Sequence, residues 1–134
     1  METPAAAKPD RAILIAAMLS AGTLVAQQVA GKATRDALFL SSFQVRSLPL
    51  IMMGSAAVSV LAVFGFSRAF TAHSPARVLP PALGLSAVLL LAEWSVNDSL
   101  PRLCAVLVYL HMAFFGATLA SGFWSLINER FDPY

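Results

Sequence analysis

The chain has 134 residues, of which 58% are hydrophobic and only 12% are charged, and its formal net charge is +2. Soluble domains carry about 25% charged residues, so the composition excludes an ordinary water-soluble domain. The small net charge and the lack of a basic run speak against a nucleic-acid partner. A single cysteine, Cys104, excludes an internal disulfide and a cysteine-based metal cluster.

The first apolar stretch runs from Ala12 to Ala26 and follows Lys8 and Arg11. Basic residues before a short apolar run are also the pattern of a signal peptide. However, no small-x-small cleavage motif follows, and three more apolar stretches lie downstream. We therefore expect a retained span over about 12–36, preceded by a short N-terminal tail over 1–11.

Three further stretches have the length of a membrane span. They cover about 48–70, 78–96 and 103–127, with Pro49 at a helix-start position and Pro80-Pro81 opening the third. Crossing the hydrocarbon core takes about 20 residues, and in lipid the backbone must satisfy its own hydrogen bonds. The sequence therefore predicts an all-α, polytopic membrane protein with one transmembrane domain over 12–127. "SRAFTAHSPAR" and "NDSLPR" are expected as connections, and 128–134 as the start of a loop.

Charged residues at the end of the first span form a pattern on a helical projection. One side carries the polar residues Gln28, Lys32, Arg35 and Asp36, and the other carries Ala26, Val29, Ala30, Ala33 and Ala37. We expect the small face to pack against other helices and the polar face to line a water-filled cavity. Lys32 and Asp36 would partly neutralise each other, which leaves Arg35 available to an anionic group.

The alternative is that 31–47 forms a helix end and an exposed loop, with Lys32 and Arg35 at headgroup level. The orientation depends on this choice. Five basic residues lie on the side of the termini and four on the other, and the split becomes five to two if Lys32 and Arg35 are helical. Termini in the cytoplasm are then expected, for a multi-pass protein of the cell (inner) membrane.

Two ionisable residues lie within the later spans. Glu93 lies near the end of the third span beside Trp94, and we expect it at the membrane interface. His111 is expected to be a hydrogen-bonded packing group, with proton coupling or solute contact as the alternative. Either residue is a candidate intramembrane polar site. We predict no metal site and no cofactor.

"TRDALFLSSF" (34–43) and "FWSLINERFDP" (123–133) resemble the ends of the first and fourth helices in the ATP/ADP translocase family. That family is a nucleotide-transporting branch of the major facilitator superfamily. There, a basic residue followed by Asp and an apolar run ends the first helix, so the resemblance implies a nucleotide contact for Arg35. Asn128 and Glu129 match the helix-end motif of helix four. Met112 stands where the nucleotide exchangers carry a carboxylate.

The resemblance implies the first four helices of a carrier with about twelve spans in two halves. The leading hypothesis is alternating-access transport of a small anionic solute, with a nucleotide as the candidate. The lipid bilayer and the missing C-terminal helices would be its partners. The alternative is a stand-alone four-helix membrane protein that serves as an assembly or interaction subunit for a partner membrane protein. No catalytic motif is present in the sequence, so we do not expect an enzyme.

Overall fold

The computed structural model describes residues 11–131, apart from the side chains of residues 130 and 131. Within this range the chain forms four long α-helices and one short 3-10 turn, Val45–Ser47. The helices are α1 (Arg11–Ser42), α2 (Leu48–Ala72), α3 (Pro75–Val96) and α4 (Pro101–Phe131). All four are long and apolar enough to cross a membrane, which confirms the predicted all-α, four-helix membrane fold.

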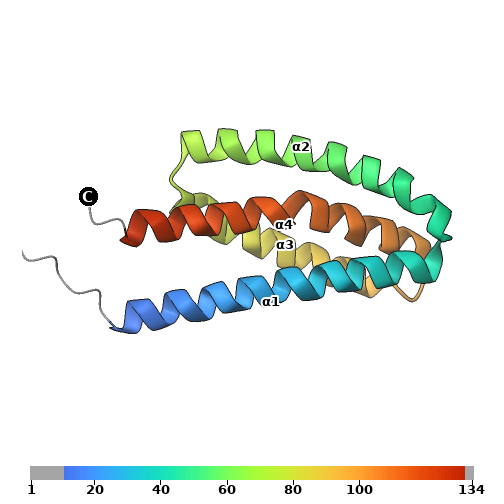
Figure 1. The fold of residues 1–134 in the computed structure, drawn as a ribbon, viewed down its shortest axis with the longest axis horizontal. Coiled ribbons are helices and arrows are strands. Elements are labelled where there is room, and N and C mark those ends of the chain that lie inside the picture. Colours follow the sequence, from blue (N-terminus) through green and yellow to red (C-terminus); the bar gives the residue numbers. More distant parts are fainter. Residues whose placement is uncertain (1–10, 132–134) are drawn as a thin grey trace, which may run out of the picture.

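Helix α4 is the centre of the structure. It lies between α1 and α2, with α3 behind it (Figure 1). Most of the buried hydrophobic residues belong to α4, whereas α1, α2 and α3 contribute one each, Phe39, Ala62 and Leu79. Most contacts between helices are therefore contacts of α4 with one of the other three.

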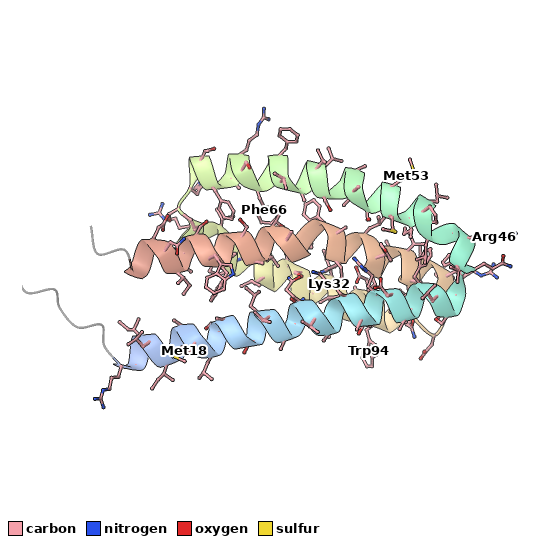
Figure 2. All side chains as sticks on the ribbon, in the orientation of Figure 1. Met18, Lys32, Arg46, Met53, Phe66 and Trp94 are labelled. Carbon is pink, nitrogen blue, oxygen red and sulfur yellow. The ribbon has the colours of Figure 1, made fainter. Side chains whose placement is uncertain are left out.

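The outer surface of the helices is apolar. Large hydrophobic side chains such as Met18, Met53 and Trp94 are 72%, 73% and 77% exposed, and they point away from the other helices (Figure 2). In water such a surface would be unfavourable, but in a bilayer it is the surface that lipid chains solvate. The arrangement fits a multi-pass membrane protein.

The connections are shorter than the sequence predicts. Most of "SRAFTAHSPAR" is helical, because α2 continues to Ala72 and α3 begins at Pro75, where a proline suits the first turn. Pro80 and Pro81 therefore lie inside α3 and do not open it. Helix α1 also continues beyond the predicted limit of its span, to Ser42.

A candidate intramembrane polar site

Two groups of polar side chains lie between the ends of the helices. The first is on α1 and consists of Gln28, Lys32, Arg35 and Asp36. The second joins α3 to α4 and consists of Ser86, Glu93 and His111. Since α1 is helical to Ser42, the expectation that Lys32 and Arg35 lie on a helix is confirmed.

Contacts between helices show where Lys32 lies along the bundle. Helix α3 has 22 residues, or about 33 Å, just enough to cross the hydrocarbon core. Ser86 lies halfway along it and is hydrogen-bonded to His111 of α4. The next residue of α4, Met112, packs against Gly31 of α1. Lys32 follows Gly31 and therefore lies within the length of the four-helix bundle, well away from the end of the structure where Arg46 lies (Figure 2).

Gln28 and Arg35 connect α1 to α4. The Gln28 side-chain amide Nε2 donates a hydrogen bond to the Gly116 carbonyl oxygen at 2.9 Å. The Arg35 guanidinium lies over the ring of Tyr109, with Cζ 4.3 Å from the ring centroid. Polar groups within a membrane span need partners within the protein, because lipid supplies none. The Gln28 contact gives one amide N–H such a partner, and the Tyr109 ring covers one face of the Arg35 guanidinium.

The expected pairing of the α1 charges is wrong. Asp36 accepts a hydrogen bond from Nε of Arg35 at 2.9 Å, so Arg35 rather than Lys32 neutralises it. The reason is that Lys32 projects to one side of the line of contact with α4. Lys32 is exposed and has no ion-pair partner within the described part of the chain.

The prediction that the small-residue face of α1 packs against the other helices is also wrong. The small residues of that face are all exposed in the structure: Ala26, Val29, Ala30, Ala33 and Ala37. The opposite side, with Gln28, Gly31 and Arg35, contacts α4 instead. Gly31 permits this approach, since a Cβ there would lie 2.5 Å from Cε of Met112.

Glu93 lies in the last turn of α3, near the end of the span as expected, but its side chain is buried against α4. It is only 9% exposed, and its Oε1 lies 3.1 Å from Nδ1 of His111. The second ring nitrogen of His111, Nε2, lies 2.8 Å from Oγ of Ser86. His111 is 6% exposed and Ser86 4%. The expectation that His111 is hydrogen-bonded to a neighbouring helix is confirmed.

Glu93 has one further hydrogen bond through its backbone and one carboxyl oxygen without a partner. Cys104 Sγ donates a hydrogen bond to the backbone carbonyl of Glu93 at 3.2 Å, which further ties α4 to the end of α3. The second carboxyl oxygen of Glu93, Oε2, is buried and has no hydrogen-bond partner among the described residues. Sequence inspection missed Ser86, because a serine in an apolar span usually bonds to its own helix backbone and gives no distinguishing signal.

A groove of about 590 Å³ runs between α1 and α3 over α4. Its lining is largely apolar, with Leu83 and Leu119 among its members. Ser86 reaches it from α3, while Ser20, Thr23 and Gln27 reach it from α1. The groove therefore gives the buried pair of Glu93 and His111 a connection to the surface through Ser86.

The remaining predicted site residues lie apart from these groups. Asn128 and Glu129 are exposed near the end of α4. Residues 132–134, at the end of the predicted loop, and the predicted tail up to residue 10 lie outside the described residues. Within 11–131, no group of three or more His, Cys, Asp or Glu side chains is placed to hold a metal ion. Comparison with known proteins gives no match, whether to a family model, to a curated protein or to a solved structure.

Proposed function

We propose that this chain forms part of a transport path for a small anionic solute across the cell (inner) membrane. The observation that carries the proposal is the place of Lys32, a cation exposed within the length of the candidate membrane-spanning helix α1, next to its contact with α4. A charge at the centre of a transmembrane helix costs about 2.5–3.5 kcal/mol on insertion scales. Such residues face water or protein and mark solute pathways.

Arg35 extends the positive charge toward α4. One of its five N–H groups is used by Asp36, and the guanidinium lies flat on Tyr109. The other four have no acceptor within the described part of the chain. A guanidinium held in this way presents two parallel donors, which suit a carboxylate or a phosphate. Lys32 supplies a second charge one helical turn away.

The mechanism is alternating access, with no chemistry on the solute. These four helices would form one wall of the path, and further helices would supply the opposite wall. A nucleotide is the solute suggested by the resemblance of 34–43 and 123–133 to the ATP/ADP translocases. If Lys32 and Arg35 lie within the membrane, the basic residues near the helix ends divide five to two, which favours termini in the cytoplasm.

The second candidate is a stand-alone four-helix subunit that binds a partner membrane protein. The exposed small face of α1 favours it, because alanines allow a second helix to approach closely. Lys32 would then pair with a carboxylate of the partner. The two candidates differ in whether water reaches Lys32.

Cysteine labelling of the full-length protein measures whether water reaches Lys32. A membrane-impermeant thiol reagent is applied to Lys32→Cys and Arg35→Cys, with Val29→Cys and Ala33→Cys as controls on the exposed small-residue face of α1. Cys104 is 1% exposed and is replaced by Ala in all variants to remove the background. A transport path predicts labelling at 32 and 35 but not at 29 and 33. Protection of all four positions would favour the interaction subunit.

Uptake into proteoliposomes then tests the solute. Radiolabelled ATP, ADP and inorganic phosphate are the probes, and Arg35→Ala is expected to abolish uptake while the protein still inserts. Arg35→Lys keeps the charge without the paired donors and should retain only part of the uptake. Unchanged uptake by Arg35→Ala would remove Arg35 from the path.

A further inference from the structure

We propose that Ser86, His111 and Glu93 form a proton-binding relay inside the membrane, reached from the groove between α1 and α3. The sequence suggests only that His111 takes part in proton coupling. The structure adds the acceptor, the order of the groups and the side from which a proton arrives. This proposal does not depend on what the protein transports.

Charge balance is the first argument. An ionised Glu93 beside a neutral His111 leaves one net negative charge in a site where both side chains are nine-tenths buried. A single additional proton makes the pair neutral, either as carboxylic acid with imidazole or as carboxylate with imidazolium. A buried net charge is costly, so the site is built to hold one exchangeable proton.

Other ionisable groups nearby do not replace that proton. Cys104, from α4, donates to the backbone of Glu93 and carries no positive charge. Arg35 and Asp36 pair with each other on α1, where Arg35 packs on the Tyr109 side of α4. On α2, Arg68 lies near the end of the helix and is exposed. Of the described residues, His111 is the one that pairs with the Glu93 carboxyl group.

The hydrogen bonds define a direction of transfer. An ionised carboxylate only accepts, so Nδ1 of His111 carries the hydrogen bonded to Oε1 of Glu93, and Nε2 accepts from the Ser86 hydroxyl. A proton from water in the groove binds Oγ of Ser86 as the hydroxyl hydrogen moves to Nε2. The Nδ1 hydrogen then moves to Glu93. The products are a neutral imidazole protonated on Nε2, a carboxylic acid and an unchanged serine.

Two further observations support the path. Oε2 of Glu93 is buried without a partner, so the carboxyl group is not held in a closed network of hydrogen bonds and can accept a proton. Ser20, Thr23 and Gln27 of α1 face the groove that Ser86 lines. Their hydroxyl and amide groups can hold water along the route from the surface to Ser86.

The test uses the purified full chain in lipid nanodiscs, titrated over the pH range in which its helix content is constant. Infrared difference spectra should contain a carboxylic C=O band that shifts in D2O and is lost in Glu93→Gln. Asp98→Asn is the control, because Asp98 is an exposed carboxylate in the α3–α4 turn, and it should leave that band unchanged. Ser86→Ala should keep the band but slow its exchange with D2O at least tenfold.

A second measurement keeps Ser86, His111 and Glu93 unchanged, so it tests the proposal even if the variants do not fold. The chain has two histidines, and the second, His73, is exposed. Nitrogen-15 NMR, assigned with His73→Gln, should show His111 exchanging between forms protonated on Nδ1 and on Nε2 as the carboxylic band grows. An imidazolium and a carboxylate that persist together across the whole range would indicate a fixed ion pair and overturn the proposal. A Glu93 that stays ionised beside a neutral His111 would overturn it equally.

Discussion

The guanidinium of Arg35 lies over the ring of Tyr109, with Cζ 4.3 Å from the ring centroid. Tyr109 is 4% exposed and is itself held edge-on by Phe39 from α1, with the two ring centroids 5.4 Å apart. The aromatic pair therefore fixes the height and tilt of the cation. Asp36 fixes one of its nitrogens from the other side.

Replacing Tyr109 separates the ring from its hydroxyl group. Tyr109→Leu removes the cation–π contact, worth about 1–2 kcal/mol when desolvated, and should weaken anion binding by about 5- to 30-fold. Tyr109→Phe keeps the ring and should stay within about twofold of the parent protein, since no hydrogen bond of the hydroxyl is involved in the contact. Titration of inorganic phosphate or ADP against the purified protein measures both. Equal losses in the two variants would mean that the hydroxyl, not the ring, matters.

A second prediction concerns the contact of Gln28 with Gly116. Gln28→Ala removes a hydrogen bond between membrane helices, which costs about 0.6–2 kcal/mol. In Gly116→Ala, the new Cβ would lie 3.1 Å from Oε1 of Gln28, so the amide must move and the bond weakens. Because both changes act on one contact, the double variant should lose less stability than the sum of the two single variants.

Reversible unfolding in mixed micelles gives the three free energies for this cycle. Ala30→Leu on the exposed side of α1 is a suitable control for changes in helix hydrophobicity. Additive losses for Gln28→Ala and Gly116→Ala would show that the two residues do not act on each other.

Gly122 of α4 lies at a tight junction between helices. It lies where α4 meets both α2 and α3, and a Cβ there would lie 2.7 Å from Cζ of Phe70 and 3.0 Å from Cδ1 of Leu79. Gly122→Ala should therefore cost about 1–3 kcal/mol through overpacking. Gly84→Ala is the matched control, since open space surrounds Gly84 and alanine is the better helix former by about 1 kcal/mol.

The same micelle unfolding measurement compares the two glycine variants. We expect opposite signs, with Gly122→Ala less stable than the parent and Gly84→Ala equal or more stable. A Gly122→Ala protein as stable as the parent would mean that Phe70 and Leu79 can move aside without loss, so that the junction is loosely packed.

Much of the fold was predictable because it depends on local properties. Four apolar stretches of sufficient length must be helical in lipid, whatever they pack against. The periodic placement of Gln28, Lys32 and Arg35 also predicts correctly that α1 continues through its charged segment. Helix ends were less accurate, because polar residues such as those before Pro75 are compatible with either a loop or a helix end.

The candidate sites were predictable only in part. A helical projection shows that Lys32 and Arg35 share a face, but it does not show which part of that face another helix covers. In the structure, α4 covers the part of this face that carries Arg35 and leaves Lys32 exposed. Likewise, Trp94 beside Glu93 suggested an interface, and only the antiparallel register of α3 and α4 places Glu93 against His111.

The sequence by itself therefore determined that this is a membrane protein of four helices with charges on the first. The tertiary structure decided the exposure of Lys32, the pairing of Asp36 and the assembly of Ser86, His111 and Glu93. The physical reason is that hydropathy and periodicity are properties of one segment. Exposure and pairing depend on the register between helices that are far apart in the chain, and that register is set by side-chain packing along α4.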